Sequence, residues 1–298
     1  MKKYVLLLAL AVPLKVYADC PDGVERCGTT EDGLTWSVSN IKDDNGNFII
    51  LSNGEIAQEL KIEGTGDMQD YKRITEGYAP WLDDRIVSTT PSSRTITKVT
   101  VGEGITSIGK NAFVDMLYLK EVSLPEGLKK IKNSGFLNAG GFLNAGITKI
   151  NLPNSLEVLE SYALFATNIS NLILPENLQR IGNRALAYLY ALSDITIPEG
   201  TSVGAWAFEK EAGDSVIETV YCLGTNPSCQ ALKNQPSMEG RVKFYEKDGD
   251  KIFYEGKWYA SSDDFATGNH IKKLRYTVEE AMKATEKGDK FHVFLTYK

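Results

Sequence analysis

Histidine, cysteine and long apolar stretches are scarce in this sequence. The 298 residues include two His and four Cys, and no stretch approaches the ~20 apolar residues that a helix needs to cross a bilayer. The Cys-x-x-Cys or close His spacing of a zinc site is absent. Neither His270 nor His292 has a sequence partner that marks a Ser/His/Asp or Cys/His arrangement. We therefore predict no catalytic residues, no metal site and no cofactor.

Basic residues are not in excess either. The chain has 33 Lys and Arg against 39 Asp and Glu, a net charge of −6. Proteins that bind the nucleic-acid backbone carry basic patches, so we predict no nucleic-acid partner. An apolar content of 42% with 24% charged residues is ordinary for a globular protein. This composition excludes a disordered chain, a collagen and a polytopic membrane protein.

The first twenty residues have the three parts of a secretory signal. A basic start is followed by an apolar run over residues 4–14. Val16 and Ala18 then occupy the two positions that a signal peptidase recognises, with residues that it accepts there. We predict cleavage between Ala18 and Asp19. A basic, apolar and small-residue order is typical of export, so the mature protein is expected to be secreted, periplasmic or on the cell surface, with no transmembrane segment.

Export changes how the four cysteines are interpreted. An even number of Cys in a secreted chain favours disulfides, and three pairings are possible. Cys20 and Cys27 are seven positions apart, as are Cys222 and Cys229. We favour these two local bridges, because the two pairs lie at opposite ends of the repeat region described next.

A repeat of 22–23 residues organises the middle of the chain. An apolar residue followed by Gly or Pro recurs at intervals of 23, 28, 22 and 23 residues, at positions 101, 124, 152, 174 and 197. The long interval contains two adjacent copies of the six residues GFLNAG, at 135–140 and 141–146. Without one copy it becomes 22. A fixed period of this length predicts a solenoid of stacked coils, here about six.

Each coil is expected to contain one short strand. Ile150 and Leu152 are two positions apart, as inward-facing strand residues are, and Pro153 ends the strand because it lacks an N–H donor. A brief helical turn is expected at the Asn111-Ala112-Phe113 type of segment. A degenerate sixth unit places Cys222 at the inward position, and we interpret its bridge to Cys229 as a cap for the solenoid.

The repeat resembles the leucine-rich repeat of the BspA type. The pattern I-x-x-V-x-L-P-x-x-L-x-x-I-x-x-x-A-F is clearest in ITKVTVGEGITSIGKNAF (96–113) and TSVGAWAF (201–208). The N-terminal segments CGTTEDGLTWSV (27–38), LKIEGTGDMQDY (60–71) and APW (79–81) resemble the module that precedes such repeats. RYTVEEA (275–281) resembles a segment found near the C-terminus of some members. The resemblance implies a secreted or surface-exposed protein, and several members of the family are described as adhesins.

The expected fold is a β-rich leucine-rich-repeat solenoid with short helical turns on its convex side, an N-terminal β module and a small C-terminal α+β tail. The predicted organisation is a signal peptide at 1–18, a β cap module at 19–87, the solenoid at 95–233 and a tail at 240–298. In the tail, two strands flanking residues 247–250 predict a hairpin. A capping box at residues 277–280 predicts a helix to about residue 287, followed by a strand at 291–297.

The predicted binding site is a pair of polar ladders on the concave sheet. In each strand, the residue between the two inward-facing positions faces outward, and so does the residue two positions earlier. Coils stacked ~4.8 Å apart align these residues in two rows. The first row is Thr100, Ser123, Asn151, Ile173, Thr196 and Tyr221, and the second is Lys98, Glu121, Lys149, Asn171, Asp194 and Thr219. A solvated sheet face, with charges paired between coils, is the competing interpretation.

These features predict a non-catalytic leucine-rich-repeat protein that binds a protein ligand, from a host or its matrix, and mediates adhesion. Two alternatives remain open. One is a glycan- or wall-binding protein that uses Trp258 and Tyr259, although a single aromatic pair favours a plain hairpin. The other is a secreted hydrolase with an unmarked carboxylate pair. Its candidate carboxylates lie in turns where solvated charges are expected: Glu103, Glu126, Glu176 and Glu199.

Overall fold

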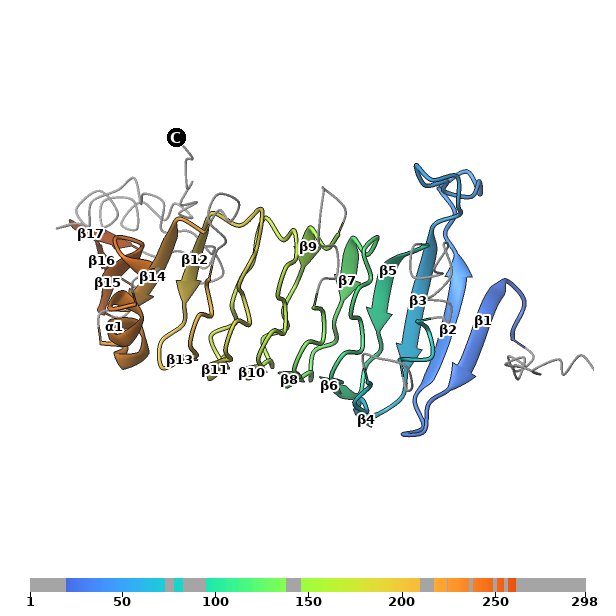
Figure 1. Ribbon diagram of the computed structural model, residues 1–298, viewed down its shortest axis with the longest axis horizontal. Coiled ribbons are helices and arrows are strands. Elements are labelled where there is room, and N and C mark those ends of the chain that lie inside the picture. The colour runs from blue at the N-terminus through green and yellow to red at the C-terminus, as the bar shows by residue number, and fades with distance from the viewer. Residues whose placement is uncertain are drawn as a thin grey trace, which may run out of the picture.

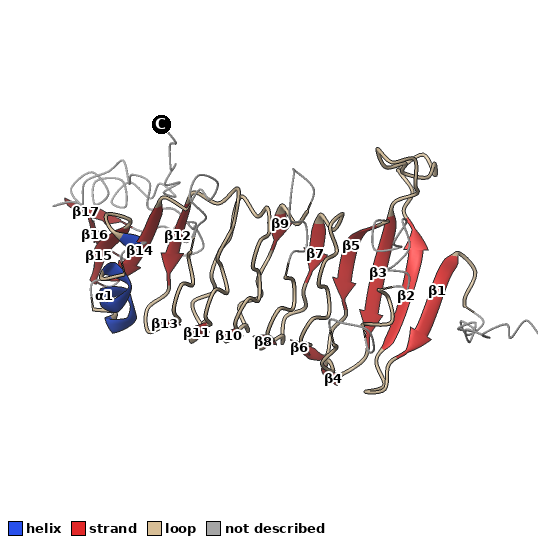
Figure 2. Ribbon diagram, in the orientation of Figure 1, coloured by secondary structure: helices blue, strands red, loops and turns tan. Residues whose placement is uncertain are grey.

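The computed structural model confirms a leucine-rich-repeat solenoid (Figure 1). It describes residues 20–72, 78–82, 95–137, 146–209, 217–223, 225–235, 238–248, 251–254 and 257–260. Strands and turns dominate, and the only helix in those ranges is the short α1 (Pro227–Lys233) (Figure 2). The predicted signal peptide, its Ala18–Asp19 cleavage point, both histidines and the helix and strand predicted after residue 275 lie outside the described residues.

Two rows of strands run along the solenoid, one on each of two sides. The first row consists of two sheets, and we call its outer surface the strand face. The first sheet contains β1 (Val24–Thr29), β2 (Thr35–Asn40), β3 (Gln58–Glu63), β5 (Ile96–Val101), β7 (Glu121–Ser123) and β9 (Lys149–Ile150). The second contains β12 (Asp194–Ile197), β14 (Thr219–Leu223), β15 (Val242–Asp248), β16 (Lys251–Tyr254) and β17 (Lys257–Ala260).

The other row is a single continuous sheet, whose outer surface we call the second face. It contains β4 (Gly66–Asp67), β6 (Ile105–Ile108), β8 (Lys130–Ile131), β10 (Val158–Leu159), β11 (Arg180–Ile181) and β13 (Ser202–Val203). Four of the five coils of the repeat region therefore carry a strand on each face, and the coil that contains β11 has a strand on the second face alone. The sixth, degenerate unit contributes β14 alone, which agrees with the weaker pattern of its sequence.

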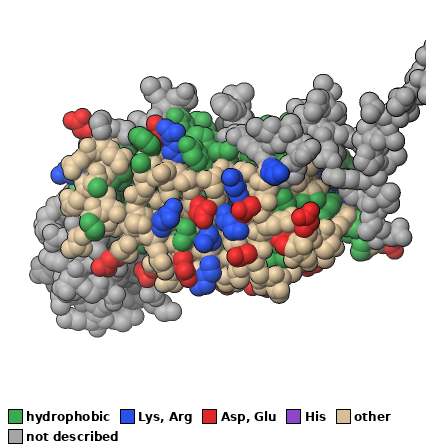
Figure 3. All heavy atoms as spheres, turned by 60° about the horizontal axis from the view of Figure 1, so that its bottom comes forward, with side chains coloured by type: hydrophobic (Ala, Val, Ile, Leu, Met, Phe, Trp, Pro, Cys, Tyr) green, Lys and Arg blue, Asp and Glu red, His purple; other side chains and the backbone are tan. Residues whose placement is uncertain are grey.

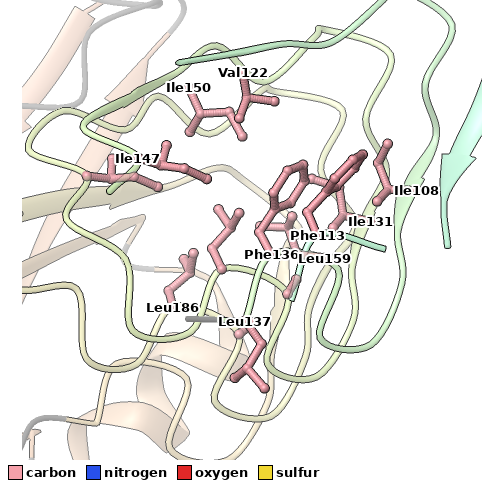
Figure 4. Packing of buried hydrophobic residues seen from close by; sticks show 14 of the residues in the cluster. Ile108, Phe113, Val122, Ile131, Phe136, Leu137, Ile147, Ile150, Leu159 and Leu186 are labelled. Carbon is pink, nitrogen blue, oxygen red and sulfur yellow. The ribbon is translucent and has the colours of Figure 1, made fainter. Parts of the chain in front are cut away.

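Inward side chains of successive coils form one continuous core. In β5, Val99 and Val101 are buried while the alternate residues Lys98 and Thr100 are partly exposed. The same alternation in every coil stacks Leu, Ile and Val in files along the axis. Figure 4 shows this packing around two phenylalanine rings, Phe113 and Phe136, whose centroids are 4.8 Å apart. Because each coil buries its apolar residues only against its neighbours, the coils stabilise one another.

The third side of each coil, which we call the turn side, consists of turns. It comprises residues 109–117, 132–137, 160–168, 182–190 and 204–209. Single i→i−3 hydrogen bonds, such as Ala163 N to Glu160 O, alternate with bonds to the next coil, such as Leu164 N to Ala185 O. The predicted brief helical turns are thus present only as isolated turns. Their alternate N–H groups all point toward the C-terminal end of the solenoid.

The chain takes a left-handed backbone conformation at one recurring position in the turn side of every coil. The residues there have φ between 54° and 60° and are not glycine: Asn111, Ser134, Tyr162, Arg184 and Trp206. A second set follows four residues later: Asp115, Ala166 and Tyr188. A side chain in this region costs roughly 1–2 kcal/mol, and Asn tolerates it best among these residues.

The N-terminal segment continues the solenoid rather than forming a separate body. Strands β1, β2 and β3 pair antiparallel, and β3 then pairs in parallel with β5. A projection between β2 and β3, residues 41–57, rises above the sheet (Figure 1). It exposes three consecutive large apolar residues, Phe48, Ile49 and Ile50.

The C-terminal end is closed by the second disulfide and α1. Both predicted local bridges form, Cys20–Cys27 and Cys222–Cys229. Cys222 stands opposite Ile197 at the inward strand position, as its spacing predicts, and is fully buried. Beyond α1, β15 extends the sheet in parallel with β14, and β15 and β16 form the predicted hairpin.

Candidate functional site

The two predicted ladders lie on the strand face in the register that the repeat spacing predicts. Lys98 stands opposite Glu121, which stands opposite Lys149, and Thr100 stands opposite Ser123. The remaining aligned positions are Lys149 with Asn171, Asp194 with Thr219, and Thr196 with Tyr221. Sequence periodicity thus placed the neighbours correctly across these coils.

The rows also continue into the N-terminal strands, which the sequence analysis did not include. Glu59 of β3 stands opposite Lys98, Lys61 stands opposite Thr100, and Ser39 of β2 stands opposite Glu59. Repeat spacing could not show that β3, which lies before the first repeat, joins the first coil in parallel.

At this N-terminal end the ladder is occupied by its own contacts. The Glu59 carboxylate accepts a hydrogen bond from the Thr100 hydroxyl at 2.7 Å, and the same oxygen lies 3.1 Å from Lys98 Nζ. The Glu59 side chain is only 17% exposed. Two of the predicted binding residues are therefore engaged within the protein, which agrees with the solvated, charge-paired interpretation for this end.

The middle of the ladder behaves differently. Glu121, Ser123, Lys149 and Asn151 are all exposed. Glu121 and Lys149 are neighbours in register, yet within the described part of the chain they form no ion pair with each other. The predicted charge pairing thus fails at this step. These polar groups are available to a ligand without first breaking an internal hydrogen bond.

A hollow of about 480 Å³ lies beside these exposed groups. It is open to solvent and mixes apolar with polar lining. Its described lining residues are Thr148, Lys149, Ile150, Asn151, Leu152, Ser170, Asn171 and Ile173. Four of them are predicted ladder residues, and Ile173 leaves 41% of its surface exposed there. The hollow therefore forms a recess within the predicted ladder.

The hollow lies where strand pairing on this face is interrupted. The first sheet ends at β9 and the next begins at β12, with the coil at residues 169–174 between them. That coil contributes one isolated bridge, Lys149 with Asn171, and one bond from Ser170 N to Thr148 O at 3.4 Å. On the second face the pairing from β10 to β11 is unbroken. Backbone pairing beside the break is therefore sparser than between β5 and β7, where three positions pair.

Two residues at the C-terminal end of the predicted ladder are buried, so this end is not the exposed surface that was predicted. Asp194 is 5% exposed and Tyr221 is 6% exposed. The Asp194 carboxylate accepts a hydrogen bond from the Ser193 hydroxyl at 2.7 Å, and Tyr221 lies on a strand paired on both sides, with β12 and β15. Thr196 and Thr219 are partly exposed. Alternation alone correctly gives the direction of a side chain but cannot show what packs over it.

The second face carries charges of both signs. Figure 3 brings this side forward and shows Lys and Arg side chains interspersed with Asp and Glu. Lys129 Nζ pairs with Glu157 Oε1 at 2.8 Å across neighbouring coils, and both side chains are over a third exposed. Such pairs contribute little to stability and leave a nearly neutral surface.

The residues proposed for the alternative functions are dispersed. Glu103, Glu126, Glu176 and Glu199 are all exposed in successive turns, as expected for solvated charges. Trp258 and Tyr259 lie on β17, opposite Phe253 and Ile252 of β16. Among the described residues there is no group of three or more His, Cys, Asp or Glu side chains that could hold a metal ion. In those same ranges, no helix is long and apolar enough to cross a membrane.

Comparison with known proteins identifies the repeat. Residues 90–213 match the BspA type leucine rich repeat region in six copies. No curated protein matches the chain. The match covers all five coils that contribute a strand to the second face, and it stops before the degenerate unit.

Solved structures with a similar fold come from bacteria. A leucine-rich repeat protein from Eubacterium ventriosum is 18% identical with a TM-score of 0.44, covering 77% of this chain and 48% of its own. A leucine rich cell surface protein from Faecalibacterium prausnitzii is 16% identical with a TM-score of 0.40, covering 75% and 61%. The pneumococcal vaccine antigen PcpA is 19% identical with a TM-score of 0.36, covering 53% and 43%. The chain thus spans about half to three fifths of the first two proteins.

Proposed function

The chain carries a BspA-type leucine-rich repeat region, and from that premise we propose that it is a secreted or cell-surface protein that binds a protein ligand without catalysing a reaction. The ligand docks at the middle of the strand face, around the hollow beside β9. Adhesion to a host or matrix protein is the role that this binding would serve.

The observation that carries the proposal is the coincidence of the hollow with two exposed ladder side chains. Lys149 and Asn151 line the hollow, and their side chains make no hydrogen bond within the described residues. Asn171 and Ile173 of the ladder line it as well. An apolar floor of Ile150 and Leu152 with polar groups around it has the composition of a protein–protein contact. Solenoids usually bind their partners over such repeated surfaces.

The two disulfides support the proposal that the protein is exported. Both disulfides require an oxidising compartment to form and persist. The basic and apolar start of the sequence fits a signal peptide that would deliver the chain there. A surface or secreted location would place the strand face in contact with other proteins.

Site-specific photo-crosslinking tests the proposed docking site. p-Benzoylphenylalanine is placed at Asn151 in the full chain, which is then irradiated with an extract of host extracellular matrix. A matched control carries the same group at Gln179, an exposed position beside β11 on the second face. We expect discrete protein adducts from position 151 that an excess of unlabelled protein competes away, with none from position 179.

Two results would contradict this function. Equal adducts from both positions would show that the strand face has no preference for a ligand. Adducts at position 151 that persist in a Lys149→Glu, Ile173→Asp variant would show that the hollow does not bind the captured protein.

A further inference from the structure

A second surface with the composition of a binding site lies on the turn side. Aromatic rings from two successive coils touch one another there, and an arginine connects them to a tryptophan of the third coil. We call this group the aromatic patch: Tyr162, Phe165, Arg184, Tyr188, Trp206 and Glu209. Trp206 is 52% exposed, and the other members are partly exposed.

The contacts within the patch are continuous. The ring of Phe165 has its centroid 5.3 Å from that of Tyr162 and 4.9 Å from that of Tyr188. Arg184 NH1 donates to the Tyr162 hydroxyl at 3.1 Å, and the Arg184 guanidinium lies 5.1 Å from the centre of the Trp206 ring. These contacts hold the exposed rings in fixed positions.

The backbone beneath the patch makes these residues costly choices. Tyr162, Arg184 and Trp206 occupy the left-handed position that recurs in each coil. The first two coils fill it with small residues, Asn111 and Ser134, which are buried. Bulky side chains are strained in this conformation, and strain that a fold retains points toward a function.

The patch is uncharged as a unit. Arg184 Nε donates to Glu209 Oε2 at 2.6 Å, so the guanidinium is neutralised by a neighbouring carboxylate. Arg184 Nε and NH1 each donate to a partner inside the patch, Glu209 and the Tyr162 hydroxyl. The patch therefore offers no net charge to an anion.

Ring geometry also distinguishes between partners. The Tyr162–Phe165 and Phe165–Tyr188 pairs are tilted by 58° and 56°, so the rings form no flat platform on which a sugar chain could stack. Trp, Tyr and Arg are the residues that dominate binding energy at protein interfaces. Tilted rings make a stepped apolar surface that suits the side chains of a polypeptide.

We propose that the aromatic patch is a second binding site, which takes an uncharged segment of another protein that presents apolar side chains. The site is independent of the strand face, since the two surfaces share no residue. Binding there is driven by apolar contact and is insensitive to salt, because its one ion pair is internal.

Peptide selection on the full chain tests this site. A phage-displayed library of random twelve-residue peptides is panned on the protein, and enriched peptides are synthesised and titrated by fluorescence anisotropy. We expect peptides rich in Leu, Ile, Met or Phe whose affinity changes less than twofold between 50 and 500 mM NaCl. Trp206→Asn should weaken them more than tenfold, and Tyr188→Asn should weaken them as well.

Trp206→Asn keeps the fold, because Asn111 occupies the same backbone position in the first coil, and Tyr188→Asn places a small polar residue where the first coil has Asp115. The matched control is Asn151→Arg on the strand face, which should leave the selected peptides bound. The proposal is overturned if no enriched peptide depends on Trp206, or if the dependent peptides are charged and lose affinity in salt. A glycan array in which Trp206→Asn abolishes binding, with no such peptide, would overturn the choice of partner.

Discussion

Trp81 donates its indole Nε1–H to the backbone carbonyl oxygen of Ala112 over 2.8 Å. The indole is fully buried, and its ring stacks on Phe113 with centroids 5.8 Å apart. Phe113 in turn stacks on Phe136 of the next coil. One file of rings therefore ties the segment at residues 78–82 to the core of the first two coils.

Replacing Trp81 should destabilise the N-terminal end strongly. Trp81→Ala removes a buried aromatic side chain, for which a loss of about 3–5 kcal/mol in the free energy of unfolding is expected. Trp81→Phe keeps most of the packing but leaves the Ala112 carbonyl without its donor, at a cost of about 1–3 kcal/mol. Urea denaturation followed by circular dichroism measures both. Ile50→Ala, at a 58% exposed position, is the control and should change stability by less than about 0.5 kcal/mol.

The two disulfides should differ in their contribution despite equal spacing. Each closes a loop of about eight residues, worth about 2.5 kcal/mol by loop entropy. Cys222 and Cys229 are also fully buried, whereas Cys20 and Cys27 are partly exposed. Replacing Cys222 and Cys229 together with Ala should therefore cost more than the same change at Cys20 and Cys27. Thermal unfolding of the two double variants compares them, and equal shifts would argue against a capping role for the second bridge.

Asn111 combines two separable contributions. Its backbone has φ 55°, and its buried Nδ2 donates to the Tyr71 carbonyl at 2.8 Å. Asn111→Gly keeps the backbone freedom and loses the hydrogen bond, for a destabilisation of about 1–3 kcal/mol. Asn111→Ala also incurs left-handed strain and should lose roughly 1–2 kcal/mol more. Urea titration resolves the difference, and equal stabilities of the two variants would show that the backbone conformation carries no cost.

The hydrogen bond from Thr106 to Asp67 should appear as a pH dependence. The Thr106 hydroxyl donates to Asp67 Oδ1 at 2.7 Å and is the main reason that the pKa of Asp67 lies below its usual 3.8. A depressed folded pKa contributes stability above the unfolded value that is lost as pH falls through the folded one. Thr106→Val should thus destabilise at pH 7, and its difference from the wild type should shrink as the pH falls below 3.8 through the folded pKa of Asp67. Carboxyl NMR titration of Asp67 checks this, with Ser170→Ala as a pH-independent control.

Export makes a direct chemical prediction. If residues 1–18 are a signal peptide, the protein recovered from the exporting cell begins at Asp19. N-terminal sequencing measures this. A protein that retains Met1 in the cytoplasm, with its cysteines reduced, would contradict both the signal and the proposed location.

Repeat periodicity predicted most of the fold because the coils impose it. Positions 101, 124, 152, 174 and 197 repeat the same inward residue, so register followed from spacing alone, as the pairing of Lys98 with Glu121 shows. The two disulfide pairings could also be predicted from the sequence, because the cysteines of each pair are close together in the chain.

Other features depend on packing that spacing does not encode. Asp194 and Tyr221 face outward as predicted but are buried, because exposure depends on what lies over a strand. The apolar pattern is intact at residues 169–174, so the repeat pattern does not predict the break in strand pairing there. Helix α1 could have been predicted from the sequence, because Asn226 and Pro227 are typical of a helix start. In the structure the Asn226 side chain caps the helix by accepting a hydrogen bond from Ser228 N.

The interruption of pairing between β9 and β12 has a mechanical consequence. At that coil the turn side and the second face keep their bonds to both neighbours, while the strand face retains a single bridge. The strand face is therefore less braced against bending at that coil than between β3 and β5 or between β5 and β7. Flexing in one direction widens the hollow and flexing in the other closes it, so a ligand wedged beside Lys149 would set the curvature of the whole rod.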